Sequence, residues 1–104
     1  MAETKTLNLE EIINILKDYK EELKEKYEVK EIGVFGSCVR GEYKKKSDLD
    51  ILVDFKEDAR IGLLKFVNME NYLSGLLGIK VDLVEKSALK PRIGKHILKE
   101  VVYL

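Results

Sequence analysis

The most constraining feature of this chain is the run DLDILVDF at residues 48–55, where acidic and apolar side chains alternate except at Leu52. Acids stand at Asp48, Asp50 and Asp54, and every position between them is large and apolar. Because successive side chains of a β-strand point to opposite faces, the run predicts a strand with one acidic face. The fold must therefore bury one side of this strand and leave its acids on the other.

The rest of the chain predicts a small sheet with helices packed against it. Apolar spacings of three and four predict helices over 7–27 and 61–77, the first with a capping box and the second ended by a glycine. β-Branched and aromatic runs predict strands over 29–35 and 79–84. Residues 87–104 predict a turn, a helix with Pro91 in its first turn, and an extended end. This order of elements predicts an α/β or α+β fold.

Length and charge exclude several classes of protein. With 104 residues, the default is a single domain spanning 1–104. Basic and acidic residues balance at 19 each, so no global positive field marks a general nucleic-acid binder, and we expect no direct nucleic-acid contact. No apolar stretch approaches the roughly 20 residues of a membrane span. The single Cys38 excludes an internal disulfide, and together with the polar start of the chain it favours a cytoplasmic location.

A glycine and a serine stand where the strand over 29–35 ends. Gly36 lets the backbone turn sharply, so that successive amides and the Ser37 hydroxyl can face an anion. A short helix that begins there would add a favourable partial positive charge for a phosphate. The pair is a weak signal by itself.

Three acids complete a candidate metal site. Asp48 and Asp50 lie two residues apart on one strand, so their carboxylates leave the same face about 6 to 7 Å apart. Such hard oxygen ligands suit Mg²⁺, which completes its shell with water and substrate phosphates. Asp82 interrupts the apolar strand over 79–84, where an unpaired buried carboxylate would be costly. If the two strands are neighbours, Asp82 joins the cluster and can hold a metal or accept a proton from a hydroxyl.

The combined motif GSCVRG at residues 36–41 and SDLD at residues 47–50 resembles the signature of the nucleotidyltransferase superfamily that includes DNA polymerase beta. The chain length and the late Asp82 resemble its minimal nucleotidyltransferase branch. The resemblance implies a small mixed sheet flanked by helices and Mg²⁺-dependent attack on the α-phosphate of a nucleoside triphosphate, expected to be ATP. By position, Asp48 and Asp50 would bind two metal ions, and Asp82 would bind the catalytic one and help to activate the acceptor hydroxyl.

The same resemblance assigns the phosphate contacts and a partner. Gly36 and Ser37 would hold the triphosphate, and Arg40 and Ser47 would contact phosphate or brace the loop. Val39 departs from the family pattern, which more often has alanine there. Minimal members resemble antitoxins of HEPN-type ribonuclease toxins, which implies a hetero-oligomeric complex and transfer of AMP to a toxin hydroxyl, typically of tyrosine. The short chain independently leaves little room for a substrate-recognition domain.

Each of these features also has a plainer interpretation. An isolated Asp-x-Asp is more often the wet face of a strand, and residues Lys44–Lys46 more often form a solvated loop than a steering patch for phosphate. We expect Cys38 to be a buried filler, His96 to be surface or packed, and the leucine-rich stripe over 63–77 to be core, or a docking face where exposed. Two alternative functions stay open: a binding module that neutralises a partner without catalysis, and nucleotidyl transfer to a small molecule.

Overall fold

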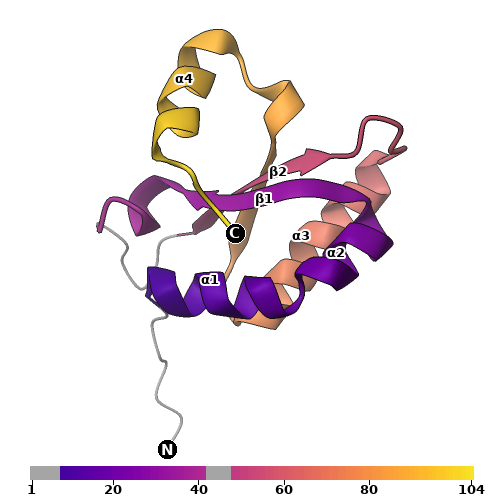
Figure 1. The fold of residues 1–104 in the computed structure, drawn as a ribbon, viewed down its shortest axis with the longest axis horizontal. Helices are drawn as coiled ribbons and strands as arrows, with labels where there is room; N and C mark the ends of the chain where they lie inside the picture. The colour runs from indigo at the N-terminus through magenta and orange to yellow at the C-terminus, as the bar shows by residue number, and fades with distance from the viewer. Residues whose placement is uncertain (1–7, 42–47) are drawn as a thin grey trace, which may run out of the picture.

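The computed structural model describes residues 8–41 and 48–104 (Figure 1). Its helices are α1 (Leu9–Asp18), α2 (Lys20–Tyr27), α3 (Leu63–Leu77) and α4 (Pro91–Glu100). Its strands are β1 (Val29–Phe35), β2 (Leu49–Phe55), β3 (Val81–Glu85) and β4 (Val102–Tyr103). Two single-turn 3-10 helices, η1 (Gly36–Cys38) and η2 (Lys86–Ala88), follow β1 and β3.

The four strands form one mixed sheet in the order β3-β2-β1-β4. β2 pairs with β3 in parallel, whereas β1 pairs antiparallel with both β2 and β4. Helices α1, α2 and α3 cover one face of the sheet, and α4 stands on the opposite side (Figure 1). The predicted α+β class with a small mixed sheet flanked by helices is confirmed.

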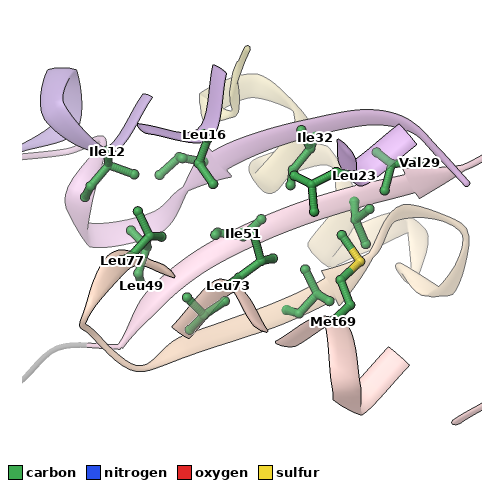
Figure 2. Packing of buried hydrophobic residues seen from close by; sticks show 14 of the residues in the cluster. Ile12, Leu16, Leu23, Val29, Ile32, Leu49, Ile51, Met69, Leu73 and Leu77 are labelled. Carbon is green, nitrogen blue, oxygen red and sulfur yellow. The ribbon is translucent and has the colours of Figure 1, made fainter. Parts of the chain in front are cut away.

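The hydrophobic core lies between the sheet and the three helices of the covered face (Figure 2). The alternating run of β2 divides as its pattern predicts: Leu49, Ile51 and Val53 are fully buried in this core. They pack in one cluster with residues of the helices such as Leu16 and Leu73. Because side chains alternate along the strand, burial of this set turns the β2 acids to the other face.

The predicted helix over 7–27 is in fact two helices, separated at Tyr19. The capping box is present, since Asn8 and Glu11 each accept a hydrogen bond from the other's backbone N–H. At Tyr19 the backbone N–H is shared between the carbonyls of Leu16 and Lys17, which tightens and ends the last turn of α1. The prediction of one continuous helix is therefore wrong, because a pattern of apolar spacing persists across a bend that keeps both helices on the same core.

Side chains of α3 hold the outer edge of β3. The backbone N–H of Val81 donates to the Ser74 hydroxyl at 3.0 Å, and the N–H of Leu83 donates to a Glu70 carboxylate oxygen at 2.9 Å. An unpaired edge strand exposes such donors, and these two side chains satisfy them. The edge strand that carries Asp82 is thereby fixed between β2 and α3.

The short β4 fits against β1 because β1 has a glycine at the contact. Gly33 is opposite Tyr103 in the register, and a β-carbon at Gly33 would lie 2.8 Å from a methyl of Val101 and 2.9 Å from the Val102 carbonyl oxygen. The N–H of Leu104 also donates to the Ile32 carbonyl at 3.1 Å. The C-terminal segment is therefore anchored to β1, an inner strand of the sheet. Within residues 8–41 and 48–104, no helix is long and apolar enough to cross a membrane.

We predict that Glu70→Ala lowers the free energy of unfolding by about 1 to 3 kcal/mol, because it leaves the partly buried Leu83 N–H without an acceptor. Chemical denaturation followed by circular dichroism measures this loss. Glu25→Ala, at an exposed position of α2, is the matched control and should change stability by less than about 0.5 kcal/mol. Equal effects of the two substitutions would show that Glu70 does not hold β3.

Candidate functional site

The site begins with two aspartates that face each other across neighbouring strands. In the parallel ladder between β2 and β3, Asp50 is the register partner of Asp82. Neighbouring strands lie about 4.8 Å apart, so the two residues share one face at close range. Asp48 stands one residue before β2. The predicted adjacency of the two acidic strands is confirmed, and it brings Asp48, Asp50 and Asp82 to one end of the open face.

Repulsion among these acids is visible in the electrostatics of Asp50. Burial raises the pKa of the half-buried Asp50 carboxyl above its ordinary value, and the negative charges of Asp82 and Asp48 raise this pKa further. The positive charge of Arg40 acts in the opposite direction. Lys80 approaches Asp48 at 3.9 Å, but this pair is exposed and contributes little. The row of acids therefore carries unfavourable negative charge that a bound cation would neutralise.

The chain turns beside Asp50 at the glycine predicted to cradle phosphate. Gly36 has φ of +80°, a left-handed conformation that disfavours other residues, and a β-carbon there would collide with Oδ2 of Asp50. The Gly36 carbonyl accepts hydrogen bonds from the N–H groups of Val39 and Arg40, which close η1. Gly36 is thus required twice, by its backbone conformation and by the close passage of the Asp50 carboxylate.

Arg40 lies after this turn and forms an ion pair with the last residue of α4. Its Nη1 donates to both carboxylate oxygens of Glu100, at 2.9 and 3.0 Å. The pair joins the turn after β1 to the C-terminal helix, and both charges influence Asp50. Sequence reasoning placed Arg40 at the site but missed Glu100. Nothing in the local pattern of Glu100 signals the contact, because its partner is 60 residues away.

Of the other residues predicted for the site, the structure describes Ser37 but not Ser47. Ser37 is partly exposed in η1, and its hydroxyl has no hydrogen-bond partner within the described part of the chain. Ser47 and Lys44–Lys46 lie outside the described residues. Cys38 is buried and free, and burial raises the pKa of its thiol, as expected for a structural filler. His96 is exposed on α4.

The donor set fits a hard divalent cation. Three carboxylates with mutually unfavourable charge offer the oxygen ligands that Mg²⁺ prefers. In the two described ranges, no group of three Asp, Glu, His or Cys side chains is arranged to hold a metal ion. An open set suits an ion that retains several waters and takes the rest of its ligands from substrate phosphates.

Residues 16–104 match the model of the family described as nucleotidyltransferase domain. Because this match spans most of the chain, the chain belongs to the nucleotidyltransferase domain family. The predicted resemblance and the predicted enzyme class are confirmed at this level.

Among particular relatives, the chain is 59% identical over 98 residues to the protein adenylyltransferase MntA of Thermococcus cleftensis. The aligned region covers 94% of this chain and 97% of MntA. A relative from Methanocaldococcus jannaschii, also named a protein adenylyltransferase, is 50% identical over 97 residues and covers 92% of this chain and 97% of its own.

Solved structures share the fold. A minimal nucleotidyltransferase structure superposes with a TM-score of 0.77 at 34% identity, covering 96% of this chain and 99% of its own. A toxin–antitoxin structure with AMP-PNP superposes with a TM-score of 0.67 at 23% identity, covering 93% of this chain and 72% of its own. A chain from a complex of an MNT antitoxin with the tri-AMPylated HEPN toxin of Shewanella oneidensis superposes with a TM-score of 0.64 at 16% identity. It covers 88% of this chain and 70% of its own. At these identities the last two are similar in fold alone.

We predict that Gly36→Ala destabilises the protein by about 3 kcal/mol or more, because it adds a collision with Asp50 to the strain of a positive φ. The matched control is Gly78→Ala. Gly78 has φ of +68°, and a β-carbon added there would meet no atom within 4 Å, so the cost should be only the strain, about 1 to 2 kcal/mol. Chemical denaturation of both variants measures the difference. Equal losses would show that Asp50 does not approach the turn as described.

We predict that Asp50→Asn raises the melting temperature in EDTA, because it removes a carboxylate whose ionisation is opposed by burial and by its acidic neighbours. The folded-state pKa of Asp50 is raised, so this group's ionisation costs stability as pH rises from the unfolded pKa through the folded one. Mg²⁺ should raise the melting temperature of the unaltered protein and have little effect on the variant.

The matched control for this prediction is Asp54→Asn, on the same strand and outside the acids that shift the pKa of Asp50. Thermal unfolding with and without Mg²⁺ measures the melting temperatures of the unaltered protein and of both variants. A lower melting temperature for Asp50→Asn in EDTA, or an equal response of both variants to Mg²⁺, would contradict the assignment of the acid row.

Proposed function

We propose that this chain is a Mg²⁺-dependent protein adenylyltransferase that transfers AMP from ATP to a hydroxyl, in particular a tyrosine hydroxyl, of a cognate HEPN-type toxin and thereby neutralises it. The observation that carries the proposal is the register pairing of Asp50 with Asp82 beside the Gly36 turn. The similarity to MntA, whose name states protein adenylylation, supports AMP transfer to a protein. The fold neighbour in complex with a tri-AMPylated HEPN toxin supports this class of acceptor.

The acids would hold the reacting groups in place. In this proposal Asp48 and Asp50 provide the carboxylates for two metal ions, and Asp82 provides a third ligand for the catalytic one. Mg²⁺, when bound, neutralises phosphate charge and stabilises the entering and leaving oxygens of an in-line displacement. The carboxylates would repel a free triphosphate, so nucleotide binding in EDTA is expected to be weak.

The turn after β1 would hold the triphosphate. Gly36 permits close approach of the backbone to the phosphates, the Ser37 hydroxyl is available as a donor, and Ser47 is assigned to the same loop region by its place in the motif. Arg40 was predicted either to contact phosphate or to brace the loop. We assign it to bracing, because its guanidinium donates hydrogen bonds to Glu100. From there its charge offsets part of the negative charge around Asp50.

The transfer itself needs one proton acceptor and one leaving group. The acceptor oxygen forms a bond to the α-phosphorus, the bond from that phosphorus to the bridging oxygen breaks, and pyrophosphate leaves. Asp82 is exposed on the acid face, where its carboxylate can take the proton of the incoming hydroxyl. In this proposal the acceptor is presented by another protein, and the name of the relative MntA, a protein adenylyltransferase, supports this.

We predict that the cognate toxin gains the mass of one or more AMP units when it is incubated with this chain, ATP and Mg²⁺. Intact-mass spectrometry measures the product directly. Asp48→Asn/Asp50→Asn should abolish the addition, since both metal-binding carboxylates are lost, whereas Asp54→Asn should retain it. Peptide mapping then identifies the modified residue.

A parallel assay of toxin ribonuclease activity separates catalysis from simple binding. If the double variant still neutralises an unmodified toxin as well as the unaltered chain does, the chain acts by stoichiometric contact, and the catalytic proposal is wrong. If the toxin is unmodified and active in every reaction, the proposed partner is wrong.

A further inference from the structure

Helix α4 is the least buried helix of the fold, although it carries both apolar and basic side chains. Of its ten residues only Gly94 is buried. It stands on the acid-bearing side of the sheet and away from the three-helix layer (Figure 1). Ile93 is 56% exposed and Leu98 is 44% exposed. Isolated helices of this length are unstable in water, because most helix stability in proteins comes from packing. Contact with a partner protein would therefore stabilise α4.

Its cations follow one face of the helix. Arg92, Lys95 and Lys99 recur at intervals of three and four, with His96 between them, and all four are exposed. Together with Pro91 they line a hollow of about 340 Å³. Throughout the described ranges, none of the three cations is paired with a carboxylate. The only acid of α4, Glu100, is engaged by Arg40.

At the N-terminal end of α4 this arrangement does not serve the stability of the helix. Like charges three or four residues apart repel one another. The first turn of α4 carries Arg92 and no acid, although the helix dipole favours negative charge at that end. A face of unpaired cations beside exposed aliphatic side chains is complementary to a surface that is acidic and partly apolar.

We propose that α4 is the docking helix for an acidic, partly apolar surface of the partner protein, which under the proposed function is the toxin. The Arg40–Glu100 ion pair holds the end of α4 next to the Gly36 turn, so a partner bound along α4 would lie beside the acid row. Ile93 and Leu98 favour a protein over RNA, because exposed aliphatic side chains complement an apolar patch on a protein surface.

Binding of purified cognate toxin by calorimetry at low and high salt tests the proposal. Arg92→Gln/Lys95→Gln/Lys99→Gln should weaken binding about tenfold or more at low salt and reduce its salt dependence. The control Lys17→Gln/Lys30→Gln/Lys56→Gln removes the same charge from exposed lysines elsewhere and should change the Kd less than twofold. Ile93→Ser/Leu98→Ser should also weaken binding of the toxin.

Docking by α4 predicts a rise in KM for the toxin with kcat retained at saturation, because the acid row is intact. Unchanged toxin affinity in the α4 triple variant would overturn the proposal, as would a triple variant that loses affinity for RNA alone. The proposed function can fail separately: if no chain adenylylates the toxin while its binding still depends on α4, the docking helix stands and the catalytic proposal is wrong.

Discussion

The parallel pairing of β2 with β3 is the interaction on which the rest of the site depends. It is the one parallel ladder of the described sheet, and it sets Asp50 beside Asp82 while Leu49 and Val81 meet in the core. A shift of one residue would send the buried set to the open face. The apolar contacts of the covered face therefore fix the geometry of the acids on the other, and Glu70 hydrogen-bonds the outer edge of β3.

The stability of the fold and the demands of the site oppose each other on the same strand. Leu49, Ile51 and Val53 stabilise β2 from one face, whereas Asp50 sits half-buried near two like charges on the other. Such arrangements persist where function requires them. Gly36 adds a backbone conformation that only glycine adopts readily, and the same small residue makes room for the Asp50 carboxylate.

Local pattern was enough to predict most elements and the row of acids. Alternation in β2 is a direct consequence of strand geometry, and the cost of an isolated carboxylate in an apolar strand pointed to a shared site for Asp82. Contacts between distant parts of the chain had no such signal. Glu100 looks like any solvated acid at a helix end, and its pairing with Arg40 depends on where α4 returns to the sheet. The break at Tyr19 likewise has no signal in the apolar spacing, which continues from α1 into α2.

We propose that Asp48, Asp50 and Asp82 form the metal and nucleotide site. Anomalous diffraction from crystals grown with Mn²⁺ and a non-hydrolysable ATP analogue tests it most directly, because Mn²⁺ replaces Mg²⁺ at oxygen ligands and is located independently of the protein. We predict Mn²⁺ peaks within about 2.0 to 2.3 Å of the carboxylates of Asp48 and Asp50, with the triphosphate beside Gly36. A nucleotide bound on another surface, with no metal at these acids, would contradict it.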